Sequence, residues 1–185
     1  TASFGRINSL YARADMEHEV AAHMARLMRP QIILHNRPSD RTLRGTMMAL
    51  GIPSVTIEIG DPQRFQPQFI KSTRRGIRRI LADMKMLPKR KLNLGPPPVI
   101  CDKSRWLYTD RGGLLEVYPE LTDLVRKGDM LARLTDVFGE VVREYRVPED
   151  AVVIGKSVNP AGATGARIAH LGRVAEPGRF RAQST

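Results

Sequence analysis

One carboxylate stands out for its surroundings, because Glu58 lies in the run 55–59 among the apolar residues Val55, Ile57 and Ile59. The residue types of this run are typical of a strand, and we expect that strand to be parallel to its neighbours. Glu58 then lies near its C-terminal end, which is where open α/β sheets place their sites. A carboxylate in a mostly buried strand must be paired, be solvated by a cleft or do chemistry. Glu58 is therefore our first candidate catalytic residue. The alternative is an outward-facing strand glutamate.

Arg44 is the second candidate, on a short predicted helix that ends near Leu50 and leads into the Glu58 strand. Its guanidinium is suited to bind a substrate carboxylate through two parallel hydrogen bonds. The alternative is a surface arginine near a helix C-terminus, where a positive charge is favourable.

The histidines and the single cysteine do not suggest a metal site. His18 and His23 are five residues apart and so face different sides of a helix, His35 follows a buried strand, and His170 lies among β-like runs. We assign each a structural or solvent role and predict no metal ligands in this chain. One cysteine, Cys101, excludes a disulfide framework and fits a reducing compartment, so we predict a cytoplasmic location.

The formal charge of +11 is concentrated between residues 71 and 91, a segment that contains nine basic residues and one acidic residue, Asp83. Apolar residues recur at three- and four-residue steps over 69–84, which predicts an amphipathic helix with a basic outer face. Such a face can neutralise phosphates, but no aromatic residue interrupts it to stack a base. We interpret it as a solvated face and predict no specific nucleic acid partner. No membrane partner is expected either, because no apolar run approaches the roughly 18 residues that span a bilayer.

The first half of the chain reads as strands alternating with helices. We expect strands at 6–11, 31–35 and 55–59, and helices after Asp15, after Ser39 or Asp40, and over 69–84. In the first helix, Val20, Met24, Leu27 and Met28 are expected to share one face. This order predicts right-handed crossovers and a parallel sheet. Three strands are few for a two-faced core, so we expect the sheet to continue upstream or to pair its open edge with another chain, as in a homo-oligomer.

A change of composition divides the chain. Pro and Gly residues at 93–98 predict a linker that no helix crosses. Beyond it, short β-like runs alternate with turns at 99–101, 105–108, 114–118, 130–134, 141–147, 152–154 and 167–171. The predicted fold class is α/β: residues 1–92 form a partial parallel sheet with flanking helices, 99–175 form a small all-β barrel, and 176–185 form a polar tail.

The second domain resembles the biotinyl/lipoyl-carrier barrel. The matching segments read VRKGDMLA at 125–132, PED at 148–150 and NPAG at 159–162. In carriers, the hairpin after the Lys-Gly-Asp segment presents a modified lysine, but residues 135–140 read TDVFGE here. Because the cofactor is attached through the amine of that lysine, we expect a carrier scaffold without the carrier function.

The whole chain is similar to the succinylglutamate desuccinylase/aspartoacylase family, zinc hydrolases of the carboxypeptidase superfamily. The segments that carry the resemblance read SFGRINSLY at 3–11, TLRGT at 42–46, VTIEIG at 55–60 and PQRFQP at 62–67. No single segment is specific for the family, but the four segments in this order are.

The resemblance implies a zinc-dependent deacylase, an amidohydrolase that cleaves an N-acyl amino acid or a related small acylated amine. It implies that Glu58 acts as general base toward zinc-bound water and then as acid toward the departing amine, since zinc brings the pKa of its water to about 7. Arg44, Arg6 and Tyr11 are implied to line the substrate pocket.

In the family, zinc is held by a His-x-x-Glu pair and by the histidine of an Asp-Leu-His-Thr segment. The present sequence begins to match at that threonine, Thr1, so we expect all three ligands upstream of it and no activity from this chain alone. The alternative from another class is a non-catalytic binding module, in which the basic helix and the barrel recognise a polyanion or a protein partner.

Overall fold

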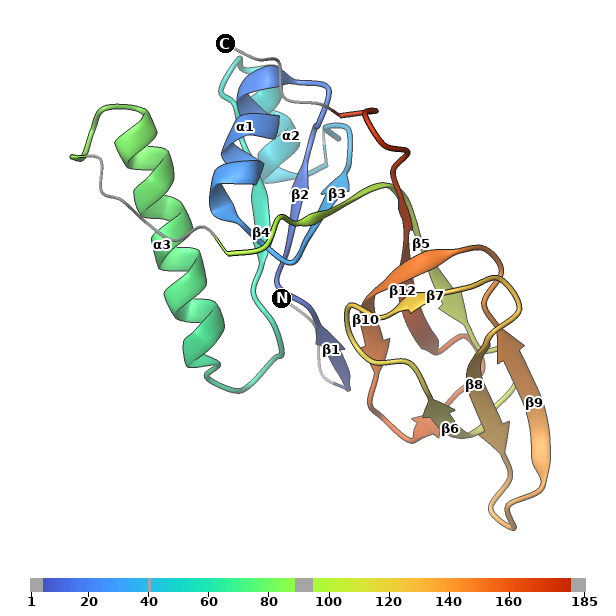
Figure 1. Cartoon of the computed structure of the whole chain (residues 1–185). Coiled ribbons are helices and arrows are strands. Elements are labelled where there is room, and N and C mark those ends of the chain that lie inside the picture. Colours follow the sequence, from blue (N-terminus) through green and yellow to red (C-terminus); the bar gives the residue numbers. More distant parts are fainter. Residues whose placement is uncertain (1–4, 40, 89–94, 181–185) are drawn as a thin grey trace. The chain divides into compact units, whose positions relative to one another are not determined.

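A computed structural model describes residues 5–39, 41–88 and 95–180. The chain divides into two compact units. Within the described residues, the α/β unit comprises 10–59, 65–102 and 175–180, and the β unit comprises 5–9, 60–64 and 103–174 (Figure 1). This division differs from the simple split predicted at 93–98. Thr1, Asp40, the start of that linker and residues 181–185 lie outside the described residues.

The sheet of the α/β unit is mixed. Its strands are β2 (Tyr11–Ala14), β3 (Ile32–His35), β4 (Thr56–Glu58) and the first residues of β5 (Val99–Tyr108), in the order β5-β3-β2-β4. Strands β2, β3 and β5 are parallel to one another, as expected. The prediction was wrong for β4, which runs antiparallel to β2. Because β4 pairs with β2 at the end of this order, it needs only one neighbour, and an antiparallel edge strand on a parallel sheet is common.

The strand predicted at 6–11 is two strands. Strand β1 (Arg6–Asn8) belongs to the β unit and pairs antiparallel with β10 (Ala151–Ser157), whereas β2 starts at Tyr11 in the α/β unit. Ser9, at the end of β1, donates both its backbone N–H and its hydroxyl to the carbonyl of Ile154, at 2.9 and 3.0 Å. These two hydrogen bonds to β10 keep Ser9 in the β unit, while the next residue, Leu10, belongs to the α/β unit.

Three helices complete the α/β unit: α1 (Glu19–Met28), α2 (Leu43–Ala49) and α3 (Pro67–Asp83). Helix α1 is capped by the ring of His18, not by Asp15, and its buried face agrees only in part with the predicted one. Met28 is buried as expected, but Val20 is 42% exposed, while Ala22 and Ala25 pack into the core on the sheet. Short side chains let the helix axis approach the sheet closely, so packing distance outweighs side-chain hydrophobicity here.

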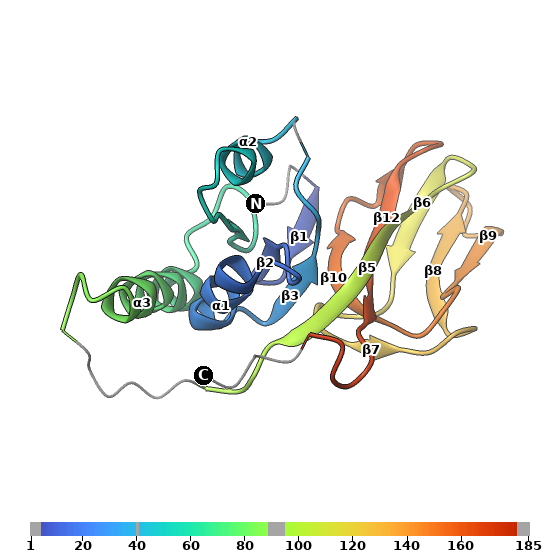
Figure 2. The same ribbon diagram turned by 90° about the horizontal axis from the view of Figure 1, so that it is seen from above.

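Helices α1 and α3 lie side by side (Figures 1 and 2). Gly76 of α3 meets the last turn of α1, where a Cβ atom would lie 2.8 Å from the carbonyl oxygen of Met28 and 2.9 Å from its Cα. Backbone atoms cannot move aside as a flexible side chain does, so only glycine permits this approach.

We expect Gly76→Ala to lower the free energy of unfolding by about 1–3 kcal/mol, the usual cost of overpacking. This cost outweighs the roughly 1 kcal/mol that alanine contributes within a helix. Urea denaturation followed by circular dichroism measures the change, with Lys71→Ala at an exposed position of the same helix as control. Equal midpoints for Gly76→Ala and the wild type would contradict the close helix contact.

The β unit is built from short antiparallel strands. They are β6 (Gly113–Val117), β7 (Leu124–Val125), β8 (Met130–Thr135), β9 (Val141–Arg146), β10, β11 (Ala161–Gly162), β12 (Arg167–Val174), β1 and the rest of β5. One sheet has the order β1-β10-β12-β5 with β7 on β10, and the other has the order β11-β6-β8-β9. Leu131, Val153 and Ile168 bring both sheets into one core. Most β-like runs are therefore confirmed as strands, whereas a barrel of the biotinyl/lipoyl kind stays a prediction.

The segment after β12 packs on the α/β unit. Arg179 pairs with the buried carboxylate of Asp102, and the ring of Phe180 lies 5.0 Å from that of His35. Residues 176–180 are thus anchored, in contrast to the polar tail expected at this position. No helix in the described part of the chain is long and apolar enough to cross a membrane.

Candidate functional site

Glu58 shares one face of the β2–β4 pair with two side chains of β2. Tyr11 lies directly opposite Glu58 in the antiparallel register, and Arg13 is two residues further along β2, so all three are on the same side. The Nε atom of Arg13 lies 3.8 Å from Oε1 of Glu58. Its Nη2 donates to the Tyr11 hydroxyl at 2.8 Å, and its guanidinium lies 5.3 Å from the centre of the Tyr11 ring.

This arrangement holds the Glu58 carboxylate in place without burying it. The Glu58 side chain is 20% exposed and that of Arg13 is 30% exposed, whereas Tyr11 is fully buried. The bond to the buried hydroxyl fixes the Arg13 guanidinium, which in turn faces the carboxylate. Arg13 was not among the sequence candidates. The alternation Tyr11-x-Arg13 was the available signal, but its meaning depends on β4 being antiparallel.

Arg44 is buried rather than on the surface, at 6% exposure. Helix α2 begins after Thr42, whose side chain accepts from the N–H of Gly45, so Arg44 lies in the first turn and not near the C-terminus. A cation is unfavourable there because the helix dipole is positive at its N-terminus. Burial lowers the pKa of the Arg44 guanidinium, and the nearby charge of Arg13 lowers it further, while Asp15 opposes this.

The guanidinium of Arg44 is only partly satisfied. Its Nη2 donates to Oδ1 of Asn36 at 2.5 Å and to the carbonyl of Arg37 at 3.3 Å. Within the part of the chain that the structure describes, its Nη1 is buried with no hydrogen-bond partner. Leaving a charged donor buried and unpaired costs free energy, so the position is suited to an anionic acceptor.

Arg6 lies in the other unit. Its guanidinium is 5.2 Å from the centre of the Trp106 ring, within the β unit. Glu58, Tyr11 and Arg44 are in the α/β unit. Arg13 of the same unit pairs with Glu58, donates a hydrogen bond to Tyr11 and lowers the pKa of Arg44 through its charge. That Arg6 lines the same pocket stays a prediction.

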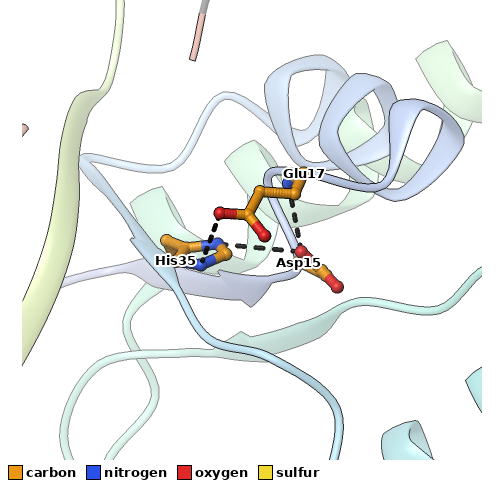
Figure 3. Close-up of side chains that lie close together, drawn as sticks. All are labelled: Asp15, Glu17 and His35. Atoms are coloured by element: carbon orange, nitrogen blue, oxygen red, sulfur yellow. Dashed lines mark hydrogen bonds and ion pairs between the residues drawn. The ribbon is translucent and has the colours of Figure 1, made fainter. Parts of the chain in front are cut away.

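A second cluster lies at the carboxyl ends of the parallel strands β2 and β3. Asp15, Glu17 and His35 each offer a ligand atom, and these atoms lie within 4.8 Å of one another (Figure 3). Nδ1 of His35 is 3.8 Å from Oδ1 of Asp15, and its Nε2 is 3.9 Å from Oε1 of Glu17. Geometrically, these are the donors of a small metal site.

The hydrogen bonds of this cluster disfavour a metal ion. The N–H of Met16 donates to Nδ1 of His35 at 3.1 Å, so the neutral ring carries its proton on Nε2. A metal on Nε2 would leave the ring with no proton, whereas a metal on Nδ1 would displace the Met16 bond. Arg37 donates to Glu17 at 2.8 Å and supplies the positive charge instead. The side-chain hydrogen bond from Arg37 is the main reason that the pKa of Glu17 is lowered. We interpret the cluster as structural, because its hydrogen bonds and ion pairs connect the end of β2 to the end of β3.

The remaining histidines have protein partners. His23 lies 2.8 Å from Oδ2 of Asp83, which connects α1 to the end of α3. His170 bonds Oγ of Ser104 at 2.8 Å and stacks on Trp106. These contacts agree with the structural roles expected for both.

The comparison with known families decides what this α/β unit resembles. Residues 2–84 match the model of the succinylglutamate desuccinylase/aspartoacylase catalytic domain. This match confirms the resemblance to the family that was predicted from the sequence. The match contains Tyr11, Arg13, Arg44 and Glu58, so the cluster described above lies within the family's catalytic domain. No curated protein sequence matches this chain significantly.

Solved structures of the family have the same fold. The ectoine utilization protein EutE (DoeB) from Ruegeria pomeroyi is 19% identical, with a TM-score of 0.80 over 91% of this chain and 57% of that one. A succinylglutamate desuccinylase from Silicibacter sp. TM1040 is 20% identical, with a TM-score of 0.78 over 92% and 55%. A succinylglutamate desuccinylase/aspartoacylase from Rhodobacter sphaeroides is 16% identical, with a TM-score of 0.79 over 95% of this chain and 57% of that one. This chain therefore spans little more than half the length of these family structures.

Proposed function

We propose that this chain supplies the general base and a carboxylate-binding arginine to a deacylase that hydrolyses the amide bond of an N-acyl amino acid or a related acylated amine. The observation that carries the proposal is the buried Arg44 guanidinium with an unpartnered Nη1, within the matched catalytic domain. A substrate carboxylate provides the missing acceptor for Nη1, and a hydrogen bond to a charged donor orients the substrate.

Glu58 is the proton carrier in this proposal. Its partly exposed carboxylate accepts a proton as a water molecule attacks the amide carbonyl, and it passes that proton to the departing amine. The products are a carboxylic acid and an amine, which at neutral pH are a carboxylate and an ammonium ion, so the two protons of water are accounted for and Glu58 returns to its starting state. Arg13 holds the carboxylate in place through the ion pair. Tyr11 fixes Arg13.

The family resemblance implies zinc, but the side chains around Glu58 do not provide a zinc site. Arg13 and Tyr11 are not zinc ligands, and the Asp15–Glu17–His35 cluster is already satisfied. Zinc, bound by residues other than those described here, would supply Lewis-acid activation of the water molecule.

The substrate class can be tested directly. In a protein that includes the metal-binding portion, we expect release of amine from N-acyl amino acids and much less from the same compounds with the carboxylate replaced by a carboxamide. Detection of the amine with a fluorogenic reagent measures both. Equal rates for the acid and the carboxamide would contradict a role for a carboxylate-binding arginine.

The alternative of a polyanion-binding module has one feature in its support. Arg74, Arg75 and Arg78 of α3 are exposed, whereas Arg79 turns inward and donates to the carbonyl of Leu27 at 2.5 Å. A solvated helix face explains the same pattern, and the site around Glu58 has no use in such a module. The deacylase is therefore the proposal we favour, and a homo-oligomer and a cytoplasmic location stay predictions.

A further inference from the structure

A cavity of about 290 Å³ lies within the β unit, apart from the residues assigned above to catalysis. Its charged lining comes from Arg6 of β1 and Arg167 of β12. Ser157 and Asn159, at and just after the end of β10, add polar groups, and Leu115 provides part of an apolar wall. A volume of this size is near the lower end of small-molecule sites.

The two arginines are held by one aromatic ring. The Cζ atoms of Arg6 and Arg167 lie 5.2 and 4.9 Å from the centre of the Trp106 ring. The His170 ring stacks on Trp106 at 4.7 Å with an interplanar angle of 10°, which fixes the indole in turn. Cation–π attraction thus keeps two positive charges close together at the cavity, against their mutual repulsion. Both long side chains are ordered before any ligand arrives.

The polar groups of the cavity are mainly donors. Oδ1 of Asn159 accepts from the N–H of Ala161 at 3.1 Å, so the amide of Asn159 has only N–H groups left to offer a ligand. Guanidinium groups have donors and no acceptor. None of the described residues that line the cavity is Asp or Glu. A neutral or cationic ligand finds few partners here, whereas an anion finds several.

We propose that this cavity binds a small organic anion through its carboxylate. Two guanidinium groups suit the carboxylate, and the apolar wall at Leu115 suits a short hydrocarbon chain attached to it. An inorganic ion such as phosphate has no group to place against that wall. The proposal does not rest on the deacylase function, because every residue in it belongs to the β unit.

Trp106, the only tryptophan of the chain, gives a local readout. We expect succinate to change its fluorescence saturably at constant ionic strength, and the uncharged succinamide to leave it unchanged. Isothermal titration calorimetry measures the same affinity independently of the fluorophore. The absence of saturable binding by both methods, or equal binding of succinamide, would overturn the proposal. Tighter binding of inorganic phosphate than of succinate would overturn the choice of an organic carboxylate.

Variants assign the binding to this cavity. Arg167→Gln is expected to weaken succinate binding about tenfold or more in calorimetry, since it removes a charged hydrogen-bond donor. The matched control is Arg143→Gln, on β9, where Arg143 pairs with Asp110 at 3.3 Å and does not line the cavity. The control should keep wild-type affinity. If Arg44→Met abolishes the binding while Arg167→Gln does not, the succinate site is in the α/β unit and the proposal for this cavity is wrong.

Discussion

Replacing Glu58 by glutamine is expected to lower turnover about 10²–10⁴-fold in a protein that includes the metal-binding portion, because general acid–base catalysis usually contributes this much. Glutamine keeps the shape of the side chain but cannot accept the proton of the attacking water. The Arg13 bond to Tyr11 does not involve Glu58, so the site should stay folded. Steady-state kinetics with a saturating N-acyl amino acid measures the loss.

Two further measurements make this experiment specific to the proton transfer. Metal content by atomic absorption should equal that of the wild type, since Glu58 is not proposed as a ligand. The control Glu149→Gln removes an exposed carboxylate of the β unit that pairs with Arg105 at 2.9 Å, and it should keep wild-type turnover. Turnover of Glu58→Gln within about twofold of the wild type would remove Glu58 from the mechanism, because a general base cannot be dispensable.

Arg44→Met is expected to raise the KM of an N-acyl amino acid about 10–100-fold with a smaller change in kcat. The estimate follows from roughly 1.5–3 kcal/mol for hydrogen bonds to charged groups, at about 1.4 kcal/mol per factor of ten. Arg44→Lys should recover only part of the affinity, because an ammonium group does not reproduce the planar arrangement in which Nη2 bonds Asn36 while Nη1 faces the substrate. Initial rates over a range of substrate concentrations separate KM from kcat.

Stability measurements distinguish this binding role from a structural one. Because Nη1 of Arg44 is buried and unpartnered, exchanging the cation for methionine should change the Tm by only a few degrees. The control Arg41→Met makes the same exchange at a neighbouring exposed position and should change neither KM nor Tm. A large fall in Tm with an unchanged KM would show that Arg44 serves the fold and not the substrate.

Some features of this protein could be read from local patterns. The helical period over 69–84 predicted α3 (Pro67–Asp83), and the apolar run before His35 predicted β3 (Ile32–His35). The segments around Arg44 and Glu58 indicated the family, and the family match confirms it. Such features depend on residues close in sequence, whose spacing follows the geometry of a helix or strand.

The buried face of α1 shows where local patterns fail. The face predicted from Val20, Met24, Leu27 and Met28 is only partly buried: Met28 is in the core, but Val20 is exposed, and the structure buries Ala22 and Ala25 in its place. Hydrophobicity ranks side chains one at a time, whereas a helix packed on a sheet is placed by how closely the two backbones can approach. Gly76 of α3 follows the same rule, since its role appears only when Met28 lies against it.

The sequence by itself therefore determined the family, the main elements and two residues of the candidate site, Glu58 and Arg44. Only the tertiary structure decided that β4 is antiparallel, which places Arg13 beside Glu58, and that Arg44 is buried with an unpartnered donor. The physical reason is that strand direction, register and burial are set by contacts between residues far apart in the chain. Local periodicity carries no information about which of those contacts form.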